Sequence, residues 1–101
     1  MSATTDAGHR RAQRIYVMMP VSVIVDFQGT PVAYEMTTVD FSILGVRVRG
    51  HIALVPGEHV ECIVVGSHDA VPSRVIWAAP ARPQQKRESG IEFLQPFKTQ
   101  V

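Results

Sequence analysis

Apolar residues recur at every second position over most of the chain, which is the period of a half-buried β-strand and not of a helix. This alternation predicts a strand over 21–27 and another over 32–36. Between them stands Gln28-Gly29-Thr30-Pro31, whose Gly and Pro are typical of a turn, so the two strands form a predicted hairpin. The apolar face of this hairpin is made by Val21, Val23, Val25, Phe27, Val32, Tyr34 and Met36.

The same pattern predicts four more strands, over 44–48, 60–64, 71–77 and 90–94. In the first of these, Arg47 lies among the polar positions and is expected to face water. Trp77 alternates with Val75, which favours a place in the core or the wall of the fold over a stacking role. The segment 78–89 contains two prolines and several charges without apolar periodicity, and is expected to be a solvated loop.

Six short strands on 101 residues predict an all-β domain, as an antiparallel barrel or a sandwich. Barrel closure is favoured because it leaves no strand edge exposed. No segment has convincing helical periodicity. The stretch 7–14 is too short for a stable isolated helix and is predicted to be a loop.

Composition narrows the function classes. With 46% hydrophobic and 19% charged residues the chain is expected to form one folded domain. A formal net charge of +1 is too small for whole-molecule attraction to nucleic acid or anionic lipid, so any anion site must be a local cluster. The lone Cys62 excludes an internal disulfide framework and is expected to be a buried thiol. No apolar run is long enough for a signal peptide or a membrane span, which predicts a soluble cytoplasmic protein without membrane insertion.

Two clusters are candidates for binding. Arg10, Arg11 and Arg14 precede the first strand, and their guanidinium groups match a phosphate or the Hoogsteen edge of guanine. On this feature alone, a solvated flexible tail is favoured over a ligand clamp. Asp40 and Ser42, with Gly45, lie between the second and third strands, where a carboxylate can accept both the N1–H and the exocyclic amine of guanine. Taken alone, these residues also suit an ordinary turn.

Together the two clusters resemble the PilZ family: Arg-x-x-x-Arg at Arg10 and Arg14, then Asp-x-Ser-x-x-Gly at Asp40, Ser42 and Gly45. The resemblance extends over 54–60, 73–77 and 90–94. It implies a six-stranded antiparallel β-barrel of the split-barrel type over 10–95, with a flexible N-terminal tail at 1–9 and a C-terminal tail at 96–101. It also implies a receptor for cyclic di-GMP and not an enzyme, without cofactor. Arg10 and Arg14 would then hold phosphate and guanine, Asp40 and Ser42 a guanine edge, and Gly45 would shape the backbone beneath.

The resemblance leaves several matters open. Arg11 and Arg47 are additional candidates that either extend the cationic surface or face solvent. Many family members continue into a C-terminal helix, for which 96–101 is too short, so the barrel mouth is expected to be less covered or covered by another subunit. Signalling is expected to pass through an unknown partner protein, and homodimerisation is left open. The alternative function is a protein-interaction adaptor of the same fold that does not bind nucleotide.

Other chemistries find less support in the sequence. The spacing of His9, His51, His59 and His68 matches no metal site. No nucleophile motif surrounds Ser42, so no catalytic residue is predicted. Binding of a nucleic acid polymer would need basic residues interleaved with aromatics on a strand face, and that pattern is absent from the sequence.

Overall fold

The computed structural model describes residues 13–64, 66–67, 69–80 and 86–95. Within them the chain forms six strands: β1 Pro20–Phe27, β2 Thr30–Ser42, β3 Gly45–Gly50, β4 His59–Val64, β5 Val71–Pro80 and β6 Arg87–Phe93. The predicted tails at 1–9 and 96–101 lie outside the described residues, as do Arg10 and Arg11.

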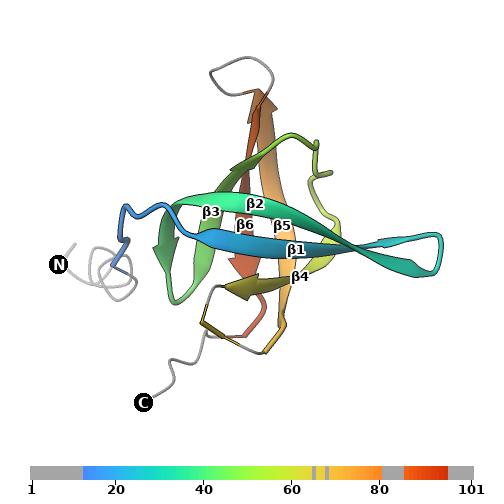
Figure 1. Cartoon of the computed structure of the whole chain (residues 1–101), viewed down its shortest axis with the longest axis horizontal. Coiled ribbons are helices and arrows are strands. Elements are labelled where there is room, and N and C mark those ends of the chain that lie inside the picture. Colours follow the sequence, from blue (N-terminus) through green and yellow to red (C-terminus); the bar gives the residue numbers. More distant parts are fainter. Residues whose placement is uncertain (1–12, 65, 68, 81–85, 96–101) are drawn as a thin grey trace, which may run out of the picture.

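The strands close into a barrel in the order β1-β2-β3-β6-β5-β4, and every neighbouring pair is antiparallel (Figure 1). This confirms the six-stranded antiparallel barrel expected from the alternation and the family resemblance. No helix occurs in the part of the chain that the structure describes. The pairing of β1 with β4 closes the barrel, so neither of these strands is left as an open edge along its paired length.

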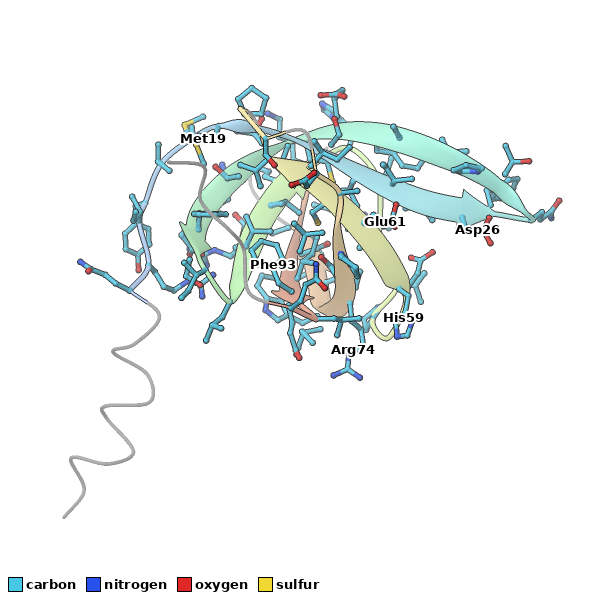
Figure 2. All side chains as sticks on the ribbon, turned by 90° about the horizontal axis from the view of Figure 1, so that it is seen from below. Met19, Asp26, His59, Glu61, Arg74 and Phe93 are labelled. Atoms are coloured by element: carbon cyan, nitrogen blue, oxygen red, sulfur yellow. The ribbon has the colours of Figure 1, made fainter. Side chains whose placement is uncertain are left out.

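The barrel interior is filled mainly by valines, whose branched side chains pack well on pleated strands. Phe41 and Phe93 contact each other with ring centroids 6.1 Å apart, which is within the range of a favourable aromatic pair. Phe93 lies within the barrel in Figure 2. The fully buried side chains of the interior include Val21, Val23, Val46, Val48, Cys62 and Val75.

The β1–β2 hairpin projects beyond the barrel, because β2 is much longer than β3 (Figure 1). Burial falls along β1 from Val21 and Val23, which are buried, to Phe27, whose residue surface is 61% exposed. Figure 2 shows Asp26 far out on this hairpin, away from Phe93. Phe27 thus continues the apolar face of β1 without being buried, because the strand leaves the barrel before reaching it.

Strands β5 and β6 extend further than the sequence indicated. Ala78–Pro80 belong to β5 and Arg87–Ser89 to β6, so the loop expected over 78–89 is shorter. Trp77 is 38% exposed, so of the two predicted places, core or wall, it takes the outer face of the wall. The reason is a register shift between Val75 and Trp77: Ile76 is an extra residue in β5 and reverses the face on which Trp77 stands.

Candidate functional site

Arg14 is brought to the barrel wall by the segment that precedes β1. Regular pairing of β1 with β2 ends at Pro20 opposite Thr37. Beyond it, the N–H of Ile15 donates to the carbonyl of Phe41 at 2.8 Å, and the N–H of Phe41 donates to the carbonyl of Ile15 at 2.9 Å. This bridge places Arg14 beside the end of β2 that carries Asp40.

Asp40 joins two arginines from different elements. Its carboxylate oxygen Oδ1 accepts from Arg14 Nε at 2.8 Å and from Arg14 Nη2 at 2.6 Å. The other oxygen, Oδ2, lies 3.0 Å from Nη2 of Arg47. The Asp40 side chain is only 6% exposed, whereas those of Arg14 and Arg47 are 43% and 35% exposed. A carboxylate this buried requires paired charge, and both of its oxygens have it.

A β-bulge turns Asp40 to the outer face of the wall. The pairing of β2 with β3 shifts between Thr38 and Asp40, which leaves Val39 as the extra residue. Thr38 consequently lies opposite the core residue Val48, while Asp40 lies opposite Arg47. Without the extra residue, Asp40 would share the face of Thr38, since side chains alternate along a strand.

Four strands contribute to one row across the outer face. Asp40 in β2 is opposite Arg47 in β3, Arg47 is opposite Gly90 in β6, and Gly90 is opposite Trp77 in β5. Directly opposed residues share a face of the sheet, and neighbouring strands lie about 4.8 Å apart. Four groups therefore lie side by side: the carboxylate of Asp40, the guanidinium of Arg47, the backbone of Gly90 and the indole of Trp77.

Gly90 makes room for the indole. A Cβ added at Gly90 would stand 2.1 Å from Nε1 of Trp77 and 2.6 Å from Cε2. The ring of Trp77 thus lies directly over the backbone of β6, in the gap that the missing side chain leaves. Any larger residue at this position would displace the ring.

The row lines a groove of about 360 Å³ on the outer wall, which we call the outer groove. Its charged lining residues are Arg14, Asp40, Arg47 and Glu92, and its apolar lining includes Leu44, Ile76 and Trp77. A volume in this range, with mixed apolar and charged walls, is typical of sites for small ligands.

Ser42 and Gly45 shape the turn beside the groove. The Ser42 hydroxyl accepts from the N–H of Leu44 at 3.1 Å and donates to the carbonyl of Gly45 at 3.4 Å. A Cβ on Gly45 would stand 2.4 Å from the carbonyl oxygen of Ile91, so glycine is required for β3 to approach β6. Gly45 lines the outer groove, whereas Ser42 is buried and does not.

The structure thus brings together Arg14, Asp40 and Gly45 of the predicted site, and Arg47, an additional candidate, lies beside them and pairs with Asp40. Sequence reasoning missed Trp77 and Gly90. Their signal was a glycine within an apolar strand pattern, which often marks a close approach at that point. Among the described residues, no group of three or more His, Cys, Asp or Glu side chains is placed to hold a metal ion.

The comparisons with known proteins identify the family. The family model of the PilZ domain matches residues 8–100, which is nearly the whole chain. The chain belongs to the PilZ domain family. PilZ domains are in general ligand-binding receptors and not enzymes. The family model covers the Arg14 and Asp40 motifs together with all six strands of the barrel.

A solved structure supports the fold independently. The Bacillus subtilis inhibitor of motility MotI/DgrA matches with a TM-score of 0.64 at 14% sequence identity. The match covers 87% of this chain but 44% of the neighbour, so this chain spans less than half of that protein's length. No curated protein matches the chain in sequence. Among the described residues, the structure contains no helix long and apolar enough to cross a membrane.

Proposed function

We propose that this PilZ domain is a receptor for cyclic di-GMP, which it binds in the outer groove. The observation that carries the proposal is the ion pair between Arg14 and Asp40, 26 residues apart, because it joins the two motifs of the family in one groove. Cyclic di-GMP carries two phosphates and two guanines. The groove offers arginines for the phosphates and a carboxylate and an indole for a guanine.

Binding is proposed to exchange partners around Asp40. A phosphate, being an anion, competes with Asp40 for the fork of donors on Arg14, whose side chain is 43% exposed. The released Oδ1 can then accept from the N1–H of a guanine, while Oδ2, which keeps a second lone pair beside Arg47, accepts from the exocyclic amine. Arg47 stays at Oδ2 and keeps the buried carboxylate oriented. Adenine lacks this pair of donors, so Asp40 would give the guanine preference.

Trp77 is proposed to stack on a guanine ring. The indole lies over Gly90, in the same row as Asp40 and Arg47, and it is partly exposed. Stacking of a base on an aromatic side chain contributes roughly 1–3 kcal/mol. The row thus provides an edge contact and a face contact within the width of four strands.

The proposed signal is an ordering of the N-terminal arginines around the bound ligand. Arg14 is already held by Asp40 and by the bridge between Ile15 and Phe41, so the proposed change concerns Arg10 and Arg11. Their contacts with the phosphates would create a new surface for a partner protein. If no nucleotide binds, the alternative function is that of an adaptor, in which the Arg14–Asp40 pair only fastens the N-terminal segment to the barrel.

Titration calorimetry tests the proposal directly with purified protein and cyclic di-GMP, and cyclic di-AMP serves as the competitor. We expect Asp40→Asn to reduce the preference for guanine by about 1–3 kcal/mol, as for the loss of one bidentate base contact. Arg47→Ala should weaken binding, whereas Arg49→Ala should not. Arg49 is the matched control, because it is equally exposed, also lies on the outer face of β3 and pairs with Glu88, but does not line the groove. Absence of heat at tens of micromolar ligand would support the adaptor instead.

Trp77 supplies a second readout, since it is the only tryptophan of the chain. Its fluorescence should change when cyclic di-GMP stacks on the ring. We expect Trp77→Ala to weaken binding more than Trp77→Phe, and Gly90→Ala to weaken it with Trp77 still present, because the new Cβ displaces the indole. Binding that leaves the fluorescence unchanged would remove Trp77 from the proposed site.

A further inference from the structure

The outer groove contains a second carboxylate, that of Glu92 in β6. Its oxygen Oε1 lies 3.7 Å from Nη2 of Arg74, which is too far for a hydrogen bond, and both side chains are nearly half exposed. Among the described residues, no hydrogen bond reaches this carboxylate. Asp40, in contrast, has an arginine at each of its oxygens. Glu92 is thus the carboxylate of the groove whose acceptor positions are open to a ligand.

The floor of the groove has a local two-fold symmetry. In the register of β3 with β6, the residues that lie opposite each other are Gly45 and Glu92, Val46 and Ile91, and Arg47 and Gly90. An antiparallel ladder has a local two-fold axis through each opposed pair, and the axis through the middle pair exchanges the two outer pairs. It therefore relates Gly45 to Gly90, and both glycines line the groove. The backbone is bare on both sides of this axis.

Each side of the axis also carries an ion pair between neighbouring strands. On one side Asp40 of β2 lies opposite Arg47 of β3 and pairs with it at 3.0 Å. On the other side Arg74 of β5 lies opposite Glu92 of β6 and pairs with it at 3.7 Å. The axis relates these two pairs, with the signs of the charges exchanged. Cyclic di-GMP itself consists of two identical guanylate halves, so a groove with one carboxylate and one glycine on each side suits both halves.

We propose that Glu92 is a specificity-determining residue for the second guanine of cyclic di-GMP, so that the outer groove reads one base at Asp40 and the other at Glu92. The inference rests on the proposed function, because it names a further contact of the same ligand in the same groove. The N1–H and the exocyclic amine of guanine are two donors on one edge, and an open carboxylate accepts from both. Adenine has an acceptor in place of the N1–H donor and is not held in this way.

Trp77 places a base within reach of Glu92. The indole lies over Gly90, and Glu92 is two residues further along β6 on the same face, about 7 Å along the strand. Asp40 is two strands away from Gly90, about 10 Å across the sheet, and its side chain is shorter than that of a glutamate. A base that stacks on Trp77 is therefore nearer to Glu92 than to Asp40. The face contact at Trp77 and the edge contact at Glu92 thus serve one guanine, and Asp40 serves the other.

Titration calorimetry with three ligands tests the proposal: cyclic di-GMP, cyclic di-AMP and the mixed dinucleotide cyclic GMP–AMP, which has one guanine and one adenine on the same phosphate ring. The unaltered protein should bind cyclic di-GMP roughly 5- to 150-fold more tightly than cyclic GMP–AMP, as expected for one bidentate base contact. Glu92→Ala should reduce this ratio to about two, which is the statistical advantage of a ligand with two equivalent guanines. The variant should still prefer cyclic GMP–AMP to cyclic di-AMP, because Asp40 still reads one guanine.

Glu88→Ala is the matched control. Glu88 also lies in β6 and pairs with an arginine of β3, Arg49, but it does not line the groove. This variant should keep the full ratio of the unaltered protein. The ratios are the diagnostic quantity, because the loss of a negative charge in itself strengthens the binding of all three anionic ligands alike.

Two results would overturn the inference and leave the proposed function standing. In the first, the unaltered protein binds cyclic GMP–AMP within about twofold of cyclic di-GMP, so that only one base is read. In the second, Glu92→Ala keeps the full preference for cyclic di-GMP, also where all three ligands bind more tightly, and Glu92 then acts on the phosphates by repulsion alone. Absence of binding by all three ligands contradicts the proposed function, and the inference with it.

Discussion

At the residue scale, the buried carboxylate of Asp40 is the centre of the proposed binding site. It is nearly fully desolvated and holds two guanidinium groups that remain partly exposed. In the proposed mode of binding, a ligand phosphate replaces it at Arg14 while Arg47 still compensates its charge. Arg14 could thus leave Asp40 for the phosphate while Arg47 remains paired with Asp40. A carboxylate with a single arginine partner would lose its only paired charge in such an exchange.

Cys62 is the residue whose protonation should govern stability in alkali. It is buried in β4 among core valines, and this burial raises the pKa of its thiol from the ordinary 9.0 to about 11, while a hydrogen bond with Ser73 lowers it in part. The folded protein therefore favours the thiol over the thiolate. The stabilisation is complete below pH 9 and is lost as the pH rises towards 11.

We predict that the free energy of unfolding falls between pH 9 and pH 11 by roughly 2–3 kcal/mol because of Cys62, at about 1.4 kcal/mol for each unit of pKa shift. Urea unfolding at pH 8 and pH 10.5 measures this loss. Cys62→Ala should lose less stability over the same interval, and the difference between the two proteins isolates the thiol from other titrating groups. Equal losses in both would show that the thiol ionises freely in the fold.

At the element scale, the turn of the β1–β2 hairpin contains a residue that is unfavourable in its backbone conformation. Gln28 has φ of 53°, in the left-handed region, and among the described residues it is the one non-glycine with positive φ. Two-residue turns of this hand favour Asn followed by Gly, because Asn tolerates the left-handed region. Here Gly29 satisfies the second position, and Gln28 occupies the first with a steric penalty.

We predict that Gln28→Asn stabilises the protein by roughly 0.5–1 kcal/mol, measured as a shift of the urea midpoint at unchanged slope. Gln28→Ala is the matched control and should not stabilise, because alanine gains nothing in the left-handed region. Gly29→Ala should destabilise, since its φ is 87°. If Asn and Ala had the same effect, the turn in solution would differ from that of the structure.

The sequence predicted the strands where their alternation is regular, but it did not predict the β-bulges. Alternation located the six strands and the inward positions of Val21, Val23 and Val75. It failed at Trp77, because one extra residue in β5 reverses the face and leaves no mark in composition. The bulge at Val39 was likewise not detectable from the sequence, although it turns Asp40 towards Arg47. The motif named Asp40 as a ligand residue, but only the register explains how the two side chains meet.

At the scale of the whole molecule, the proposed site spans four neighbouring strands of the barrel. Its row of residues comes from β2, β3, β6 and β5, and Arg14 precedes β1. No strand of this row can separate without removing a wall of the outer groove. A ligand that binds there should therefore stabilise the closed barrel as a unit, and its effect should not stay local to the N-terminal arginines.

We therefore predict that ligand binding raises the free energy of unfolding by the same amount in all six strands. At a free cyclic di-GMP concentration of about 100 times the dissociation constant, the free energy of unfolding should rise by about 2.7 kcal/mol. Native-state hydrogen exchange should show that rise at core amides of all six strands, including Val23 and Cys62, which do not line the groove. Trp77→Ala at the same ligand concentration should show a smaller rise, and Arg49→Ala the full one. Protection confined to the segment before β1 would mean that the ligand contacts the arginines alone, without engaging the row across the barrel wall.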